Sequence, residues 1–456
     1  MSESLEKRIF YIFILLQPLL DLVTSLMSRY IELPLTLGIM VRSLFMVYMF
    51  VYSVLIYRPK EKIYKLTRII LILIAIYISI FLGYSIMQNG TMYIATQIKG
   101  IIKLFYFPIV LAGVFIFNSK HKIVVSNKLL TYVLLMYTGV IFVATITGTS
   151  FRSYANYSYG LGYVGWFYAA NETGTIIATL APLTIINLIK NKLNVVNVFS
   201  MILCIFSVLY MGTKVPFLAF GIYIFGLFVL MIINLIYSKS NNVRMQYDYK
   251  KITIYLVSII IATGVLFYQS PLYKNLMFNY GHLIQKITHI SSSSEDNKQE
   301  ENIKVNEHVD QDDVVNALLS NRAGFAKEVK KIYKKSSVAD KLIGLGHIVE
   351  IEDGVYTEKT IEMDFLDISY RHGIIGTILY FAQLVLIMLL TIKNIFINKK
   401  CLLNMDIFMI IASIVVTMGI AYTAGHVLTA PGVAFFLVIL ITRLYNDTSV
   451  SSEINY

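Results

Sequence analysis

The chain has 456 residues, of which 57% are hydrophobic and only 14% are charged. This composition, with a mean hydropathy of +0.68, excludes an ordinary soluble domain and favours a protein built into a membrane. The formal net charge of +12 would also suit nucleic-acid binding, but the basic residues cluster in alternate loops, which is an effect of membrane topology.

Apolar runs recur along the chain, and each is long enough to cross a hydrocarbon core of about 30 Å as a helix. Unpaired backbone groups are not tolerated at membrane depth, and the alternation of barrel strands is missing from the sequence. The sequence therefore predicts an all-α integral membrane protein with about twelve transmembrane helices and one large external, partly helical loop. The expected spans are 8–28, 33–57, 67–87, 94–117, 128–147, 169–189, 194–212, 215–237, 251–270, 366–392, 405–423 and 428–445.

These spans divide the chain into helices 1–9 in residues 1–270, a polar loop at 271–365, helices 10–12 in residues 366–445, and a tail at 446–456. Basic residues gather in every second loop and near both ends, so the positive-inside rule predicts that both termini are cytoplasmic and the long loop is external. The basic loops lie within 58–62, 120–128, 190–192, 239–251 and 393–400.

Two further features of the sequence concern cleavage of its N-terminus and bonding of its cysteines. The first apolar stretch is longer than the core of a signal peptide, carries Asp21 and lacks a small-residue cleavage site, so we expect it to remain as the first span. Cys204 falls within a span and Cys401 within a cytoplasmic loop, so we expect neither a disulfide nor a cysteine metal site.

The external loop has three predicted parts. Residues 271–290 carry spaced apolar positions and are predicted to form an amphipathic helix on the membrane surface. Residues 291–313 are serine-rich and acidic, and are predicted to be mobile. Residues 314–346 are predicted to form a helix up to Tyr333, followed by a turn into a glycine-containing segment. A loop of this length with its own helices is more often functional than a passive connector.

A shorter external loop, at 148–168, is rich in tyrosine. Tyrosine is common at membrane interfaces, which gives the ordinary interpretation of this loop. The more specific alternative is that these rings stack against a sugar.

Charged residues inside the spans are costly, and they usually face a bundle interior or a wet cavity. With cytoplasmic termini, Arg42, Lys99 and Lys103 lie in the outer half of their spans, and the two lysines share a helix face. Several cations in one apolar cavity need an anion, which a substrate phosphate or pyrophosphate would supply. The alternative is internal pairing, such as Asp21 with Arg42, together with snorkelling of Arg371.

Four segments, in order, resemble motifs of the O-antigen ligase and O-antigen polymerase superfamily. The first holds Asn171 and Glu172 at the start of a span, and in the second Lys214 stands where the family has arginine. The third joins Arg322 to the glycines of 342–346. The segments are Gly165–Gly174, Gly212–Ala219, Leu319–Arg322 with Leu342–Gly346, and Glu362–Leu366 with Gly373 and Gly376.

The resemblance implies a metal-independent, inverting glycosyltransferase without a cofactor, acting at the outer face of the cytoplasmic membrane. Its donor would be an undecaprenyl-pyrophosphate-linked oligosaccharide and its acceptor a hydroxyl of another glycan. A flippase and a chain-length regulator are the protein partners to expect, and nucleic acid is not. The pyrophosphate would contact Arg322, Lys214, Arg42 and Lys103, and the rest of the substrate would contact Asn171, Glu172 and Lys99.

The catalytic base is the point at which the chain departs from the family. Glu362 occupies the position of the family's histidine, and a carboxylate can also serve as a general base. Asp364 and His426 are further candidates for this role. Each has an ordinary alternative, because acids are favoured at a helix N-terminus and histidine is common at interfaces.

Other functions stay open at the level of sequence. A lipid-linked oligosaccharide flippase, or another polytopic transporter, would also carry charged spans, although no inverted repeat is visible and a structured external loop is not needed for alternating access. A transferase using a monophosphate lipid donor fits less well, because the first external loop holds a single acid, Glu32. A purely structural scaffold fits the buried charges least. Ligase and polymerase share a donor and differ in the acceptor. The composition, rich in Ile, Lys, Asn and Tyr, suggests a bacterium with an AT-rich genome. If that cell lacks an outer membrane, it has no lipopolysaccharide core to serve as acceptor, which slightly favours a polymerase.

Overall fold

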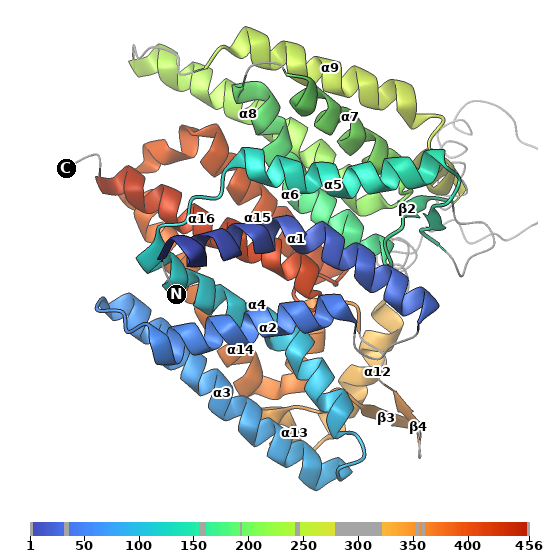
Figure 1. The fold of residues 1–456 in the computed structure, drawn as a ribbon, viewed down its shortest axis with the longest axis vertical. Coiled ribbons are helices and arrows are strands. Elements are labelled where there is room, and N and C mark those ends of the chain that lie inside the picture. The colour runs from blue at the N-terminus through green and yellow to red at the C-terminus, as the bar shows by residue number, and fades with distance from the viewer. Residues whose placement is uncertain are drawn as a thin grey trace, which may run out of the picture.

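The computed structural model describes residues 3–31, 36–154, 161–191, 194–241, 247–278, 322–352, 355–357 and 361–453. Most of them lie in long helices that run side by side through one bundle (Figure 1). Both chain termini lie at one end of the bundle, here named the terminal end. The short elements of the polar loop lie toward the opposite end, here named the loop end (Figure 1).

The described residues from 3 to 267 form nine long helices. They are α1 (Glu3–Tyr30), α2 (Leu37–Val51) with the π-helical turn η1 (Tyr52–Ile56), α3 (Lys62–Asn89), α4 (Ile94–His121), α5 (Asn127–Ile146), α6 (Ala170–Lys190), α7 (Val195–Tyr210), α8 (Lys214–Asn241) and α9 (Tyr249–Phe267). Between α5 and α6 lie two short antiparallel strands, β1 (Phe151–Arg152) and β2 (Tyr163–Gly165).

The C-terminal part begins with the described portion of the polar loop. Its elements are α12 (Arg322–Lys335), α13 (Val338–Ile343), β3 (Val349–Glu352), β4 (Val355–Thr357), α14 (Asp364–Ile397), the 3-10 turn η2 (Lys399–Leu403), α15 (Met405–Thr423) and α16 (Pro431–Glu453). Strands β3 and β4 pair as an antiparallel hairpin.

Each predicted span coincides with one of these helices, so the prediction of an all-α membrane protein is confirmed. In the described part of the chain, ten helices are long and apolar enough to cross a membrane. The apolar helix α7 is shorter, and the apolar run of α16 ends at Ile441, about halfway along that helix. The expected number of about twelve spans therefore stays a prediction for α7 and α16.

Helices α4 and α6 lie at the centre of the bundle. Their most apolar windows are 83% and 94% buried inside the protein, against 17% for the peripheral α9. Small and hydroxyl-bearing residues on α6 let neighbouring backbones approach closely, as is usual where helices meet in a membrane. For example, Ser413 of α15 donates to the carbonyl of Thr179 at 2.6 Å, and the hydroxyls of Thr179 and Thr417 lie 2.9 Å apart.

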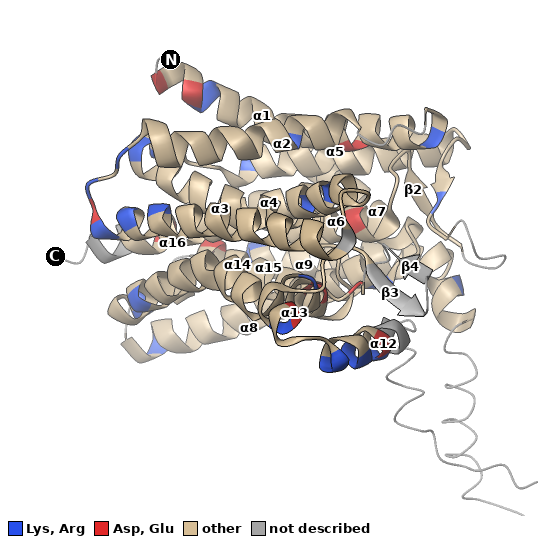
Figure 2. Ribbon diagram, turned by 90° about the horizontal axis from the view of Figure 1, so that it is seen from below, with Lys and Arg blue, Asp and Glu red and all other residues tan. Residues whose placement is uncertain are grey.

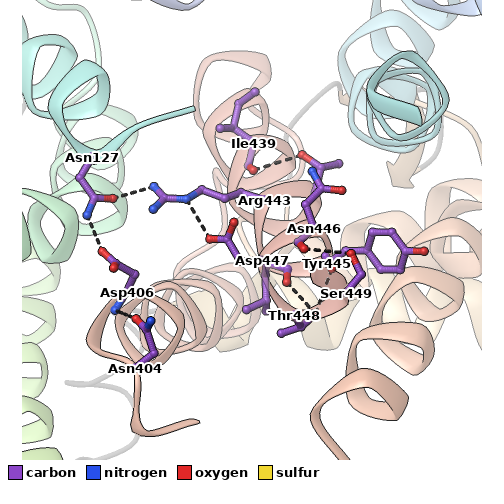
Figure 3. A network of polar contacts seen from close by, with 12 residues as sticks. Asn127, Asn404, Asp406, Ile439, Arg443, Tyr445, Asn446, Asp447, Thr448 and Ser449 are labelled. Carbon is purple, nitrogen blue, oxygen red and sulfur yellow. Dashed lines mark hydrogen bonds and ion pairs between the residues drawn. The ribbon is translucent and has the colours of Figure 1, made fainter. Parts of the chain in front are cut away.

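A polar network joins four helices at the terminal end (Figure 3). Arg443 of α16 donates to Asn127 Oδ1 at 2.6 Å, and Asn127 donates to Asp406 of α15 at 2.7 Å. Asp406 also forms an ion pair with Lys190 of α6. Asn127, Lys190 and Asp406 lie at the ends of their helices, whereas Arg443 lies midway along α16. The network therefore fixes these ends of α5, α6 and α15 against the middle of α16.

The structure describes only part of the predicted polar loop. Residues 271–278 are helical, as expected, but residues 279–321 lie outside the described residues. The predicted mobile segment at 291–313 and the predicted helix start near residue 314 fall in that range. The later part of that predicted helix is found as α12, which buries Ala326 and Val329 against Leu345, Leu366 and Tyr370.

Candidate functional site

Helix α14 is interrupted near its loop end, at Gly373, whose φ of 59° and ψ of −166° are not helical. An interruption of this kind frees backbone carbonyls, and at membrane depth these groups must find partners within the protein. The polar loop supplies them. The amide of Leu345 donates to the carbonyl of Tyr370, and the amide of Gly346 donates to that of Arg371, each at 3.0 Å. The segment 344–346 is therefore docked into the break of α14.

Two tyrosines of α3 hold α13, the helix directly before the docked segment. The hydroxyl of Tyr77 lies 2.8 Å from the carbonyl of Ile343 and 2.9 Å from that of His372, and so bridges the loop and α14. The hydroxyl of Tyr84 donates to Asp340 of α13 at 2.7 Å. Burial raises the pKa of the Asp340 carboxyl, but hydrogen bonds from Tyr84 and Ser337 outweigh it, so the pKa is lowered overall and the carboxylate stays ionised.

A cavity of about 260 Å³ opens beside the docked segment. Its walls come from α4, the start of α6, the residues around the start of α14, and the connection between α15 and α16. Many of the residues that sequence analysis selected meet here. Those that line the cavity are Lys99, Lys103, Glu172, Glu362, Asp364 and His426.

Asp364 links two parts of the cavity wall. Its Oδ1 accepts hydrogen bonds from the amide of His426 at 3.0 Å and the hydroxyl of Thr429 at 2.9 Å. Its Oδ2 accepts from the amides of Val427 and Leu428 at 2.9 and 2.7 Å. This buried carboxylate therefore fixes the α15–α16 connection against the first turn of α14.

The two remaining candidate bases sit on unusual backbone. Glu362 and His426 have φ values of 56° and 59°, in the left-handed region that residues other than glycine rarely adopt. Gly425 allows the two segments to approach, because a Cβ there would lie 2.6 Å from the carbonyl carbon of Glu362. Conformations of this kind persist where the surrounding structure determines them, and they cluster at functional sites.

A buried ion pair forms part of the cavity wall. Arg371 donates to Asp367 Oδ1 at 2.8 Å, and the amide of Ile361 donates to the same oxygen at 3.1 Å. Both charged side chains line the cavity and are almost fully buried, so the snorkelling that sequence analysis considered for Arg371 does not occur. Asp367 was missed, although its i,i+4 spacing from Arg371 was a usable signal.

The wall formed by α4 carries Lys99 and Lys103, which lie one turn apart. Both side chains are exposed, and neither forms an ion pair within the described residues. Their charges are therefore available to an anion that enters the cavity.

The other predicted residues lie away from these walls. Arg42 forms an ion pair with Asp21 at 2.7 Å, which is the pairing that sequence analysis kept as the alternative. Lys214 begins α8, and Asn171 is exposed beside Glu172, but neither lines the cavity. Arg322 begins α12, and its side chain lies outside the described residues.

Sequence analysis also missed His347, a buried residue that lines the cavity. Its amide donates to Gln97 Oε1 of α4 at 2.9 Å. Burial, with smaller effects from His372, Arg371 and Lys103, lowers the pKa of His347 well below its usual value, so the ring is neutral. The available signal was its position directly after the Gly344-Leu345-Gly346 sequence.

The tyrosine-rich connection between α5 and α6 is tied to the end of α1. Arg29 donates to the carbonyl of Tyr168 at 3.1 Å, and its guanidinium lies 4.0 Å from the ring centre of Phe151. The rings of Tyr163 and Tyr168 are exposed. This arrangement suits either the interfacial or the sugar-stacking interpretation.

As for metals, no group of three or more His, Cys, Asp or Glu side chains within the described ranges is arranged to hold an ion. The cavity wall holds both cationic side chains and carboxylates, which suits binding of an anionic substrate near a proton acceptor.

The chain matches a model of a known protein family. The model for "O-antigen ligase like membrane protein" matches residues 3–449, which is nearly the whole chain. No curated protein matches the chain.

Proposed function

Because the chain belongs to the family of O-antigen ligase-like membrane proteins, we propose that it is a glycosyltransferase of the polymerase or ligase type. It transfers a glycan from an undecaprenyl-pyrophosphate donor to a sugar hydroxyl of an acceptor. The observation that carries this proposal is the cavity beside the break of α14, in which Lys99 and Lys103 lie on one wall and Glu172 and Glu362 on others.

The lysines are assigned to the leaving group. Displacement of a lipid pyrophosphate breaks the bond between the anomeric carbon and a phosphate oxygen, and negative charge grows on that oxygen. Cations held in a cavity of low dielectric stabilise this charge. Lys99 and Lys103 are available for this task, whereas Arg42 and Arg371 already pair with Asp21 and Asp367.

Glu362 is assigned as the general base. The acceptor hydroxyl attacks the anomeric carbon from the face opposite the pyrophosphate, so the configuration inverts. The proton of the acceptor hydroxyl passes to the Glu362 carboxylate as the new glycosidic bond forms. Asp364 is less suited to this role because its oxygens already accept four hydrogen bonds, so we assign it to positioning. His426, on the neighbouring backbone, is the alternative base.

The loop end is proposed to face the outside of the cytoplasmic membrane. Many of the basic residues lie at the end where both termini lie (Figure 2). In the chain, Lys60, Lys122 and Lys400 fall in the short connections after η1, α4 and α14. The positive-inside rule places such connections in the cytoplasm. The lysines of α12 do not weigh against this orientation, because long loops are translocated largely regardless of their charge.

The test is a transfer assay with purified protein, an undecaprenyl-pyrophosphate oligosaccharide and an acceptor glycan. Glu362→Gln removes the proton acceptor but keeps the shape of the side chain, and we expect transfer to fall by about 100-fold or more. Glu328→Gln, at an exposed position of α12, is the matched control and should leave transfer unchanged.

Two results would change the proposal. Full transfer by Glu362→Gln would remove Glu362 as the base and direct attention to His426. Movement of the lipid-linked oligosaccharide across the bilayer by the wild type, with no glycosidic bond formed, would establish a flippase instead.

A further inference from the structure

His347 has no assigned part in the proposed transfer, yet it lies in the cavity wall. The residue is 7% exposed, and its Nε2 is buried without a hydrogen-bond partner in the described part of the structure. Its ring centre lies 5.0 Å from that of His372. Buried polar groups in folded proteins are nearly always paired, so an exception next to a cavity requires an explanation.

Gly100 is the reason that the ring fits at this point. A Cβ at position 100 would collide with Cγ, Nδ1 and Cδ2 of His347. The imidazole therefore lies directly against the backbone of α4, on the turn whose two ends carry Lys99 and Lys103. The docked segment 344–346 delivers His347 to this position, so the contact depends on the break of α14.

The surroundings of the ring hold both cations and carboxylates. The charged or titratable groups that face it or share its cavity are Lys99 and Lys103 of α4, Tyr77 of α3, Asp367, Arg371 and His372 of α14, Glu172 of α6, and Glu362, Asp364 and His426. Asp367 forms an ion pair with Arg371, and the oxygens of Asp364 accept hydrogen bonds from three backbone amides and from the hydroxyl of Thr429. Burial and the nearby cations keep the imidazole neutral, with a pKa well below its usual value, while no anion is bound. An anion beside Lys99 and Lys103 would act in the opposite direction and raise the pKa of the imidazole.

We propose that His347 is a third ligand, with Lys99 and Lys103, for the pyrophosphate of the lipid donor, and that it takes up a proton from water when the anion binds. Gly100 is the positioning residue that admits the ring. The proton adds a charge-assisted hydrogen bond to the bound pyrophosphate, and it returns to solvent when the product lipid leaves. This inference rests on the proposed function of the cavity.

The direct test is calorimetric binding of inorganic pyrophosphate to the full-length protein in detergent. His347→Asn and Gly100→Ala should each weaken binding about tenfold, the effect of one lost charge-assisted hydrogen bond. His347→Gln, which keeps an N–H at similar reach, should recover part of the loss. Gly83→Ala on α3 is the matched control, because no atom lies within 4 Å of a Cβ at that position.

Proton uptake provides a readout that a purely structural role would not change. Titrations in two buffers of different ionisation enthalpy should show net uptake by the wild type, and none by His347→Asn. The same titrations with undecaprenyl pyrophosphate, undecaprenyl monophosphate and phosphatidylglycerol identify the source of the anion. We expect preference for the pyrophosphate lipid in the wild type, and loss of that preference in His347→Asn.

Wild-type affinity and undiminished proton uptake in both His347→Asn and Gly100→Ala would overturn the inference. So would binding of phosphatidylglycerol as tightly as the pyrophosphate lipid. If the transfer assay succeeds while the donor KM of His347→Asn equals that of the wild type, the inference is wrong and the proposed function stands. If pyrophosphate binds as expected but no glycosidic bond forms, the proposed function is wrong and the anion site stands.

Discussion

Two carboxylates of the cavity wall are held by well-defined partners, and this supports positioning roles for them. Asp364 accepts four hydrogen bonds, and Asp367 pairs with Arg371. Glu362 lines the cavity on backbone in the left-handed region. From the sequence, Glu362 was the first candidate for the base because it occupies the position of the family's histidine, and Asp364 and His426 were further candidates. The hydrogen-bond donors of Asp364 come from a distant part of the chain, so the sequence could not show them.

Asp364→Asn should destabilise the protein by about 2 kcal/mol, because the amide nitrogen would face N–H groups that it cannot satisfy. The measurement is thermal unfolding in detergent. Asp248→Asn is the control: Asp248 caps α9 by accepting from the amide of Lys251 at 3.2 Å, and asparagine caps equally well, so a change within about 0.5 kcal/mol is expected. Equal stability of the Asp364 variant and the wild type would contradict the anchoring role.

At the scale of elements, the break in α14 organises the site. The sequence predicts a continuous span at 366–392, and Gly373 and Gly376 were visible only as part of a family-like motif. The structure interrupts the helix at Gly373 and fills the gap with segment 344–346. Hydropathy cannot detect this, because a broken helix and a continuous one have the same apolar residues. The partners of the freed carbonyls come from a different part of the chain.

Gly373→Ala should disrupt this docking for two reasons. A Cβ would lie 2.7 Å from the amide nitrogen of Gly344, and a φ of 59° disfavours alanine. We expect a loss of about 1–3 kcal/mol in thermal unfolding, together with loss of glycan transfer. Gly419→Ala in α15, where nothing lies within 4 Å, should be neutral or slightly stabilising. Full transfer activity in Gly373→Ala would show that the break is not needed.

At the scale of the whole molecule, the bundle separates two polar ends. The network of Asn127, Asp406 and Arg443 (Figure 3), which Lys190 joins through Asp406, lies toward the terminal end. The docked loop and the cavity occupy the loop end. This separation agrees with the basic connections from which the sequence predicts a cytoplasmic position for both termini.

The orientation can be tested by labelling single cysteines in intact cells with a reagent that does not cross membranes. The background replaces both buried native cysteines, Cys204→Ala and Cys401→Ala. Lys335→Cys, exposed at the end of α12, should react, and Lys60→Cys, exposed between η1 and α3, should react only after the cells are opened. The reverse pattern would place the cavity on the cytoplasmic side and exclude transfer at the outer face.

The sequence by itself determined the membrane class, the positions of the helices and the order of the family-like motifs. It could do so because a spanning helix satisfies its backbone locally and needs only a long enough apolar run. Only the tertiary structure decided which charges within the predicted spans form ion pairs and which face the cavity. Arg42 pairs with Asp21, while Lys99 and Lys103 stay open to the cavity. It also brought His347 against Gly100, because contacts between residues so far apart in the chain depend on how the helices pack.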